Sequence, residues 1–362
     1  MKIKNILLGG LMIAAALSSC SKDSDGDSPN NKTGDARLTI SLQASGAGTK
    51  ADNEELSGEA NINNVSVLQF NESGSTLQIE PYFTEVSGNG SITLPDIPAS
   101  SGMAKIVIVT NTVGNPFANV TSYSQMQALL AQLADQKRDN LTMSSEVIST
   151  VKPLVAGDNY LGYSSVSKEE NINNINTPLE VTRLAARLDL NGIYTDFSAS
   201  VLEGRTVRVE EVSVINTKTS SHFFSEGYWG VVMDNTKNYG QIAPVTLNRD
   251  IYDGNPITGV ILRGYVLEND GKDLPTQLRV RATLLANDQY LAETKTFTAT
   301  VNLSGVLIQG VAHKYVKRNH VYRLTLTFGK NSFDPILNPM AELDVKVEVV
   351  AWGPVTQDVE IE

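Results

Sequence analysis

The sequence predicts an all-β protein composed of β-sandwich domains, with one short helix. Stretches in which apolar and polar residues alternate recur from residue 36 onward, and this period of two is typical of half-buried strands. Turn-forming groups such as Glu72-Ser73-Gly74 and Asp253-Gly254-Asn255-Pro256 separate these stretches. Regular short strands with such turns favour sandwiches over a parallel α/β sheet.

The first predicted strand covers residues 37–44. Leu38, Ile40 and Leu42 alternate with polar residues, so their side chains share one face that we expect to be buried. The continuous apolar run at residues 106–109 predicts a central strand. The other main strands are expected at residues 65–70, 207–215, 260–267, 278–285, 295–303, 321–328 and 343–350.

One helix is expected in the N-terminal domain, over residues 122–136. Its apolar residues recur at helical spacing on one face, which we expect to pack against a sheet. Ser122 with Gln125 fits a capping box at its start.

The chain length predicts two domains and a leader segment, since 362 residues exceed twice the typical domain length of roughly 150 residues. Hydrophobic residues make up 41% of the chain, which is enough to build two cores. A polar stretch that ends near Thr177-Pro178 predicts the boundary. We therefore expect an N-terminal β-sandwich domain over residues 36–180 and a C-terminal one over residues 181–350.

The composition disfavours several classes of function. A formal net charge of −11 disfavours nucleic acid as a partner, because phosphate backbones attract basic proteins. Three histidines and one cysteine leave little for a metal site. The sequence has no motif of a catalytic nucleophile, and the glycine-containing segment 46–51 does not have the spacing of a phosphate-binding loop. We expect no catalytic residue, no metal, no cofactor and no enzymatic activity.

The first 20 residues have the pattern of a lipoprotein signal peptide. Lys2 and Lys4 precede an apolar run at residues 6–17 that is too short to span a bilayer comfortably. Small residues then lead to Cys20, the only cysteine of the chain. The pattern predicts that Cys20 is acylated and anchors the precursor in lipid. An ordinary signal peptide that contains a cysteine is the alternative. Residues 21–35 are acidic and rich in turn formers, so they should form a solvated tether.

The C-terminal tail, residues 351–362, shares the alternation of the first strand. Val355, Val359 and Ile361 lie on one face of an extended chain, and acidic residues lie on the other. Both segments are therefore amphipathic strands near the ends of the chain, and we expect one to be able to replace the other. The alternative is that the tail is an edge strand of its own domain.

A small, flexible segment with a single basic residue, Lys50, follows the first strand, and such segments are typical of exposed protease sites. Cleavage between Lys50 and Ala51 by a trypsin-like protease would separate strand 37–44 from the rest of the chain. The loss of a strand exposes an apolar groove and unpaired backbone groups, which the tail of another subunit can fill. Because the donor strand and the groove are different surfaces, repetition builds a filament.

The order and spacing of several motifs carry a family resemblance. These motifs are Ala156-Gly157-Asp158-Asn159-Tyr160-Leu161-Gly162-Tyr163-Ser164, Val181-Thr182-Arg183-Leu184-Ala185-Ala186-Arg187, Gly264-Tyr265-Val266-Leu267-Glu268-Asn269, Arg318-Asn319-His320 and Val349-Val350-Ala351-Trp352. Together with the segment that ends at Cys20 and the basic residue before Ala51, they make nearly the whole chain resemble the fimbrillins, the major-type subunits of the type V pili of Bacteroidia.

The resemblance implies two transthyretin-like β-sandwich domains and export as an outer-membrane lipoprotein. It also implies proteolytic removal of the leader with the first strand, and donor-strand exchange between identical or homologous pilin subunits. Such a cell-surface fimbrium would support adhesion and biofilm formation. Well-known members are cut after arginine, whereas the matching position here is Lys50. Either the protease accepts lysine or cleavage lies elsewhere, with Arg37 as a candidate. The short tail after Trp352 predicts a shaft subunit rather than a tip subunit.

A monomeric surface lipoprotein that binds glycans is the alternative function. His222-Phe223-Phe224 and Tyr228-Trp229 would supply the aromatic platform for a sugar. The more common role of such residues is packing in a core or between domains.

Overall fold

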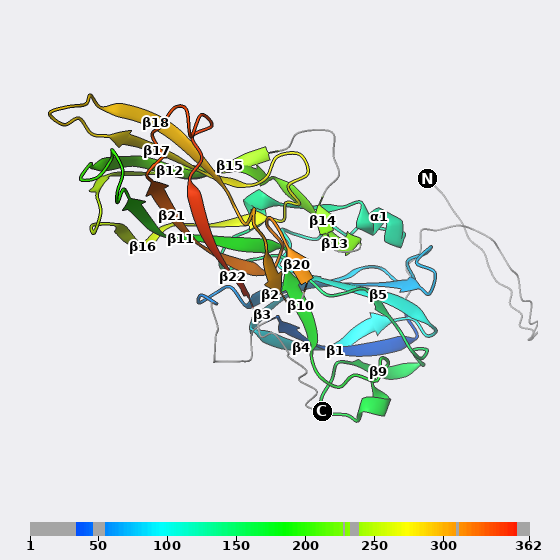
Figure 1. Cartoon of the computed structure of the whole chain (residues 1–362). Coiled ribbons are helices and arrows are strands. Elements are labelled where there is room, and N and C mark those ends of the chain that lie inside the picture. The colour runs from blue at the N-terminus through cyan, green and yellow to red at the C-terminus, as the bar shows by residue number, and fades with distance from the viewer. Residues whose placement is uncertain (1–33, 46–54, 227–228, 232–238, 309–310, 353–362) are drawn as a thin grey trace, which may run out of the picture. The chain divides into compact units, whose positions relative to one another are not determined.

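The computed structural model describes residues 34–45, 55–226, 229–231, 239–308 and 311–352, and these residues are almost entirely β structure (Figure 1). The predicted all-β sandwich class is confirmed. Strands were expected from period-two alternation, and each of the stretches predicted after residue 200 overlaps a strand of the structure, although the one expected over 295–303 ends at Thr300. None of the described helices is long and apolar enough to cross a bilayer.

The N-terminal half of the described chain builds a nine-stranded sheet with the main path β3-β2-β5-β7-β10-β1-β4, while β8 pairs with β5 and β9 with β1. These strands are β1 (Ala36–Ala44), β2 (Asn61–Asn71), β3 (Tyr82–Asn89), β4 (Ser91–Ala99), β5 (Ala104–Thr110), β7 (Met143–Ser144), β8 (Ile148–Ser149), β9 (Gly157–Leu161) and β10 (Leu179–Arg183). β3 and β4 stand at opposite ends of this path, yet only Gly90 joins them, so the path curls back on itself. Gly90 has a φ of 81°, a conformation that glycine adopts at no steric cost.

The C-terminal half builds two four-stranded sheets with one apolar core between them. One sheet has the order β16-β11-β21-β22 and the other the order β15-β12-β17-β18. Their strands are β11 (Ala185–Asp196), β12 (Val207–Lys218), β15 (Tyr239–Ile251), β16 (Ile257–Leu267), β17 (Gln277–Leu284), β18 (Glu293–Thr300), β21 (His320–Gly329) and β22 (Asp344–Ala351). Val212 and Val280 of one sheet and Leu190 and Leu324 of the other belong to the same buried cluster, as a sandwich requires.

Two smaller sheets complete the described structure. The first has the order β14-β13-β6, and the second consists of β19 and β20. Their strands are β6 (Leu130–Gln132), β13 (Ser220–Glu226), β14 (Trp229–Val231), β19 (Val306–Ile308) and β20 (Val311–His313). Because β6 pairs with β13, a segment of the N-terminal half joins a segment of the C-terminal half in one sheet. The domain boundary between residues 180 and 181 stays a prediction.

The predicted helix over residues 122–136 is wrong in its length. The helix α1 covers Tyr123–Gln127 only, and a 3₁₀ turn, Leu133–Asp135, follows β6. Pairing of β6 with β13 takes up the residues that would have continued the helix, so tertiary hydrogen bonds override the local apolar spacing.

The predicted capping box is half formed. The Ser122 side chain accepts a hydrogen bond from the Gln125 amide at 3.3 Å. The Gln125 side chain, however, accepts from the Thr121 amide at 2.9 Å instead of from Ser122. The cap therefore satisfies one helix donor and fixes the residue before it.

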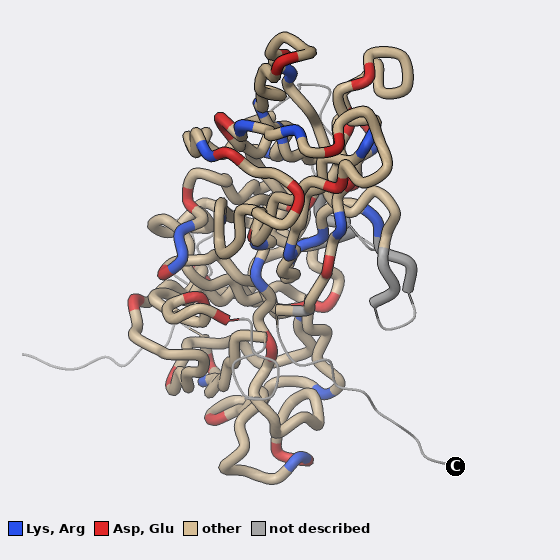
Figure 2. Tube along the Cα trace, turned by 60° about the vertical axis from the view of Figure 1, so that its left-hand side comes forward, with Lys and Arg blue, Asp and Glu red and all other residues tan. Residues whose placement is uncertain are grey.

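Basic and acidic positions lie interspersed along the described chain (Figure 2). Several exposed pairs are ion pairs, such as Arg208 with Asp250 at 2.7 Å and Arg323 with Glu348 at 3.2 Å. Exposed pairs of this kind contribute little to stability, about 0–1 kcal/mol each. The buried charges described below are of a different kind.

Candidate functional site at the first strand and the start of the tail

β1 is an internal strand with partners on both sides. On one side it pairs antiparallel with β4 from Ala36 to Gln43. On the other side its first half runs parallel to β9, and its end runs parallel to β10. Removal of β1 would therefore leave backbone donors and acceptors of three strands without partners, which is costly in the absence of a replacement.

The apolar face of β1 is buried as the alternation predicts. Leu38, Ile40 and Leu42 are at most 2% exposed and belong to the core of the N-terminal half. The burial of such side chains contributes roughly 1.5–3 kcal/mol each. Their burial is a property of the structure, while their displacement on maturation stays a prediction.

The two ends of β1 differ in their charge environment. Before its start, the Asp35 carboxylate accepts hydrogen bonds from the Ser101 hydroxyl at 2.6 Å and the Ser101 amide at 2.8 Å, and these bonds lower the pKa of Asp35. After its end, the Ser45 amide donates to the Val181 carbonyl at 2.9 Å. The Ser45 carbonyl accepts from Arg183 Nη1 at 2.7 Å. The start of β1 thus follows a carboxylate, Asp35, and its end lies beside the Arg183 guanidinium.

A buried group of charged and aromatic residues, here named the Glu59 cluster, lies at the end of β1. Its members are Glu55, Glu59, Arg183, Arg187, Asp189, Tyr265 and Trp352. The two oxygens of the Glu59 carboxylate accept from Arg187 Nη1 at 2.7 and 2.9 Å. Both arginine side chains and the Glu59 side chain are at most 1% exposed. Charges this deeply buried are tolerated only because they are paired.

Trp352 places the last described residue of the chain in this cluster. Its indole Nε1 donates to Glu59 Oε2 at 3.0 Å, and the Tyr265 hydroxyl donates to Glu59 Oε1 at 2.7 Å. The two aromatic rings stack with an interplanar angle of 3°, and the Arg183 guanidinium lies 5.0 Å from the Trp352 ring centroid. The point where the tail begins is therefore fixed to Glu59, which follows the predicted cleavage segment.

Burial shifts the ionisation of several cluster members. The pKa of Arg183 is lowered because its guanidinium is desolvated, although Glu55 and Glu59 partly compensate. Burial raises the pKa of Glu55 and outweighs the attraction of Arg183. Burial and the hydrogen bond to Glu59 raise the pKa of Tyr265, so its hydroxyl remains a donor at neutral pH. These shifts indicate a site with little water. The loss of any hydrogen-bond or ion-pair partner there should strongly reduce the stability of the fold.

Opposite charges alternate through the cluster. Asp189 accepts from Arg187 at 3.1 Å and from Arg263 at 2.6 Å, so β11 and β16 are tied to the same chain of charges. The Arg183 side chain donates to the main-chain carbonyl of Glu59 at 2.9 Å and to the carboxylate of Glu55 at 2.6 Å. The network thus joins segments that are more than 120 residues apart in the sequence.

A second buried group, the Glu268 cluster, consists of Glu268, Lys317 and Arg318. Glu268 accepts from Lys317 at 2.9 Å and from Arg318 at 2.7 Å. Burial opposes its ionisation, but the two cations outweigh burial and lower the pKa of Glu268. Arg318 also donates to the main-chain carbonyl of Phe223 at 3.0 Å and so holds β13 in place. His320 Nδ1 donates to the Arg318 carbonyl at 2.7 Å, as its predicted structural role requires.

Four of the five motifs singled out in the sequence meet in these two clusters, and the motif at residues 156–164 contributes to neither. Arg183 and Arg187 come from one motif, Tyr265 from a second and Trp352 from the last. Glu55 and Glu59 complete the site, and sequence reasoning missed both. The available signal was the presence of charged residues inside the apolar stretch from Leu184 to Ile193, because such charges need buried partners.

Several predicted site residues lie outside the described part of the chain. They are Cys20, Lys50, Ala51, Val355, Val359 and Ile361. Lipidation, cleavage and strand donation by these residues stay predictions. The described segments that flank them are β1 with Ser45, Glu55 and Trp352, and the Glu59 cluster brings these flanks together.

Two of the aromatic residues proposed for a glycan platform, Phe223 and Phe224, do not lie on an exposed face. Phe223 and Phe224 are buried, and the Phe223 ring packs edge to face on Phe117 at 5.2 Å. Tyr228 is outside the described residues. Packing is therefore the role of Phe223 and Phe224.

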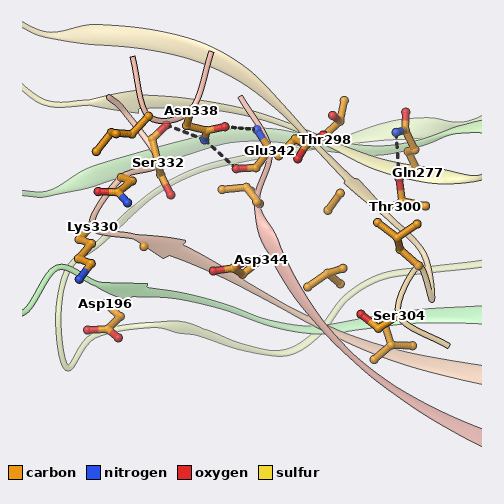
Figure 3. A pocket seen from close by; sticks show the side chains of 18 of the residues that line it. Asp196, Gln277, Thr298, Thr300, Ser304, Lys330, Ser332, Asn338, Glu342 and Asp344 are labelled. Carbon is orange, nitrogen blue, oxygen red and sulfur yellow. Dashed lines mark hydrogen bonds between the residues drawn. The ribbon is translucent and has the colours of Figure 1, made fainter. Parts of the chain in front are cut away.

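A polar pocket of about 760 Å³ lies at the edges of β18 and β22 (Figure 3). Its polar side chains are partly engaged with their surroundings: Asn338 donates to the Glu342 carbonyl at 2.8 Å, and Gln277 donates to Thr300 at 3.1 Å. No aromatic residue is among those that line it. The pocket therefore lacks the stacking surface of the glycan hypothesis. Among the described residues, no group of three or more metal-ligating side chains is placed to hold a metal ion.

Two family matches divide the described chain. Residues 36–183 match the major fimbrial subunit protein (FimA) family, and residues 184–352 match the C-terminal domain of the fimbrium tip subunit Fim1C-like family. A relative from Parabacteroides distasonis, named "Putative fimbrium tip subunit Fim1C", is 38% identical over 98% of both chains. The major fimbrium subunit FimA type-2 of Porphyromonas gingivalis is 24% identical over 99% of both chains.

Solved structures agree with these matches. A crystal structure from Parabacteroides distasonis, described as a "putative cell adhesion protein", has a TM-score of 0.79 and 37% identity and covers 90% of this chain and 100% of its own. The fimbrilin of Porphyromonas gingivalis W83 has a TM-score of 0.64 at 20% identity, which shows a shared fold. The buried clusters, the sandwich fold and these similarities lead to one conclusion: this chain belongs to the fimbrillin family of Bacteroidia fimbrial subunits.

Proposed function

We propose that the chain is a structural subunit of a cell-surface fimbrium, exported as an outer-membrane lipoprotein and polymerised by donor-strand exchange after proteolysis. The observation that carries the proposal is the position of β1. It is an internal strand that pairs on both sides and has a buried apolar face, and it ends at Ala44, six residues before Lys50. Removal of such a strand creates a groove that selects another amphipathic strand.

The energetics favour a stable precursor and an unstable cleaved groove. Before cleavage β1 fills its position as part of the same chain, so no outside strand is needed. After cleavage the segment is held by non-covalent contacts alone and can dissociate at a rate that depends on its sequence. A tail with matching alternation then regains the backbone hydrogen bonds and the apolar burial, at the cost of association entropy.

The place of the subunit in the fimbrium has two candidates. One is a shaft position, in which the subunit both receives a strand and donates one. The similarity of residues 184–352 to a tip-subunit family favours a tip position, where one of the two connections is not used. Gold labelling of an epitope inserted in the β17–β18 turn distinguishes the two positions. Gold particles along the whole filament would indicate a shaft subunit, and gold at one end would indicate a tip subunit.

The proposal as a whole is tested by controlled proteolysis. Purified precursor should remain monomeric, and the same protein treated with a trypsin-like protease should form a ladder on SDS gels without boiling and filaments in electron micrographs. A cleaved protein that stays monomeric at high concentration contradicts strand exchange.

Replacement of Cys20 by alanine is expected to abolish lipid labelling and surface display. The reason is that the thiol is the acceptor for the acyl chains, and several chains on one cysteine make a stable anchor. The measurement is incorporation of labelled palmitate, followed by membrane fractionation. A Ser19→Ala variant keeps the thiol and serves as control. Normal fractionation and labelling of Cys20→Ala would contradict lipidation at this residue.

The mature subunit is expected to begin at Ala51. Lys50 is the single basic residue between β1 and Glu55, so a trypsin-like protease cutting there releases β1 and keeps Glu55 and Glu59. N-terminal sequencing of assembled fimbriae is the measurement, and Lys50→Gln, which should block maturation, is the matched variant. Assembled subunits that begin at Ser21, or at Leu38 after a cut at Arg37, would show that cleavage lies elsewhere.

A further inference from the structure

Arg205 is a buried cation that lacks a carboxylate partner. Among the described residues, four arginines are at most 7% exposed. Three of them, Arg183, Arg187 and Arg318, form ion pairs with glutamates. Arg205 is 6% exposed, yet no carboxylate of the described residues forms an ion pair with it. Because an unpaired buried charge is costly, a cation in this position suits a partner that comes from outside the chain.

The guanidinium of Arg205 has donors to spare. Nη2 donates to the Leu285 carbonyl at 2.6 Å, whereas the buried Nε has no acceptor among the described residues. The guanidinium carbon lies 5.3 Å from the centroid of the Tyr290 ring. This cation–π contact compensates part of the cost of burial, but it leaves the hydrogen-bonding capacity unused. A carboxylate would use it, because charge-assisted hydrogen bonds between a guanidinium and a carboxylate are strong and directional.

A pocket of about 250 Å³ lies beside Arg205, at one end of the C-terminal sandwich. Three connections line it: residues 197–206 between β11 and β12, residues 285–292 between β17 and β18, and residues 330–343 between β21 and β22. The apolar lining residues of these connections are Val201, Leu202, Tyr290, Leu291, Phe333 and Pro335. Val201 is 81% and Leu291 90% exposed, so the mouth of the pocket is apolar. An apolar pocket with a cation on its wall selects a ligand that is apolar at one end and anionic at the other.

The other charges of the lining favour a single negative charge on the ligand. Glu293 is paired with Lys295 at 3.2 Å. The Asp334 carboxylate accepts hydrogen bonds from two main-chain amides at 2.7 and 2.9 Å, which hold the pKa of Asp334 below its ordinary value and keep it ionised at neutral pH. These two carboxylates, balanced in part by Lys330, would repel a second negative charge. A monocarboxylate therefore fits better than a phosphate group, which carries about two charges at neutral pH.

The size of the pocket limits the ligand. A volume of about 250 Å³ equals the space of about eight water molecules, and it is below the roughly 300–1,000 Å³ of pockets for drug-sized ligands. Such a pocket fits one ring with a short acid chain and is too small for a chain of several sugar rings.

We propose that the Arg205 pocket binds a small monocarboxylate that carries an apolar group of the size of a phenyl ring. The carboxylate contacts the Arg205 guanidinium, and the apolar group packs against the side chains at the mouth, including Leu291. The inference goes beyond the proposed fimbrial function. It does not depend on cleavage or strand exchange, since the site lies within the C-terminal sandwich of the uncut chain.

Three probes separate the charge from the apolar group. Uncut precursor carrying Cys20→Ala is titrated with 3-phenylpropionate, 3-phenylpropionamide and glucuronate, and binding is followed by ligand-observed NMR. The amide has nearly the shape of the first probe and lacks its charge. Glucuronate keeps a carboxylate but has a polar ring in place of the apolar one.

The acid 3-phenylpropionate is expected to bind about tenfold or more tightly than its amide, and tenfold equals about 1.4 kcal/mol. It should also bind more tightly than glucuronate. Equal binding of acid and amide, or no binding of the acid, overturns the carboxylate site. Binding of glucuronate as tight as that of 3-phenylpropionate overturns the apolar half of the proposal and favours a sugar acid. Fimbrial assembly is measured separately on cleaved protein, so none of these results bears on it.

The variant Arg205→Met tests the assignment to this residue. It removes the charge but keeps an unbranched side chain, so the ratio between acid and amide affinities should fall toward one. Arg208→Met is the matched control on the adjoining strand β12, because Arg208 is an exposed arginine that pairs with Asp250. The control loses the same charge and should keep the ratio. An unchanged ratio in Arg205→Met overturns the assignment.

A second pair of variants leaves the buried arginine in place. Leu291 is 90% exposed, so its replacement should leave the fold intact. Leu291→Asp and Leu291→Asn differ by one charge and hardly in shape. The affinity for the acid should be severalfold lower in the aspartate variant than in the asparagine variant, while the affinities for the amide should be equal. Equal affinities for the acid would overturn the placement of the carboxylate in this pocket, even if Arg205→Met does not fold.

Discussion

Replacement of Val359 by aspartate is expected to abolish polymer formation and to leave the unprocessed subunit folded. In the proposed exchange the Val359 side chain enters the apolar part of a neighbour's groove, where Leu38, Ile40 and Leu42 are buried before cleavage. A carboxylate placed there has no partner, and such a charge costs several kcal/mol. The subunit's own stability should not change, because the tail belongs energetically to the neighbour.

The control is Glu360→Lys, on the opposite face of the same strand. That face is expected to be solvated, so this variant should polymerise nearly as the unaltered chain does. Polymer is measured on SDS gels without boiling after controlled proteolysis, and folding is measured by thermal denaturation of the precursor. If Val359→Asp polymerises normally, or if it unfolds the precursor, then the tail is an ordinary strand of its own domain and the donor assignment is wrong.

Replacement of Glu59 by alanine is expected to destabilise the precursor by about 3–5 kcal/mol, the range for removal of one partner from a buried ion pair. The Glu59 carboxylate accepts from Arg187, Tyr265 and Trp352, and also from the Leu56 amide at 2.7 Å. Its loss leaves these buried donors with fewer acceptors and removes the contact that holds Trp352.

Urea denaturation of the precursor measures this effect, with Glu348→Ala as the matched control. Glu348 also pairs with an arginine, Arg323 at 3.2 Å, but its side chain is 61% exposed, so its loss should cost at most about 1 kcal/mol. If Glu59→Ala does not fold, Glu59→Gln preserves the volume and should still cost more than the control. Equal midpoints for the Glu59 and Glu348 variants would show that the cluster is not important for stability.

The sequence could predict the first strand because a local signal determines it. In β1 each second residue is apolar, and each of these side chains is buried in the structure. The helix over residues 122–136 failed for the opposite reason. Its apolar spacing is real, but β13, about 90 residues further on, pairs with Leu130–Gln132 and turns them into strand β6. The spacing of apolar residues within a segment cannot predict that the segment pairs with a strand so distant in the chain.

The Glu59 cluster shows the same limit for a site. Arg183, Arg187 and Trp352 stood out in motifs, but nothing local identifies Glu59 as their acceptor, since it is 128 residues from Arg187 and 293 from Trp352. Arg187 and Asp189 within the apolar β11 did indicate that buried partners exist. Only the fold determines which of the chain's acidic residues they are.

The parallel pairing of β1 with β10 has a consequence for biosynthesis. Leu42 lies opposite Leu179, which is 137 residues further along the chain. At about 5–20 residues per second, the ribosome delivers that partner roughly 7 to 27 seconds later. β1 can pair with β4 once residue 99 has been made, but its other edge has no partner until β9 and β10 follow. The indole of Trp352 closes on Glu59 later still, because it is made 293 residues after Glu59. A nascent chain that stops short of this tryptophan has all strands of its N-terminal sheet but lacks the contact that closes the Glu59 cluster, so the cluster can close only after residue 352 has been made.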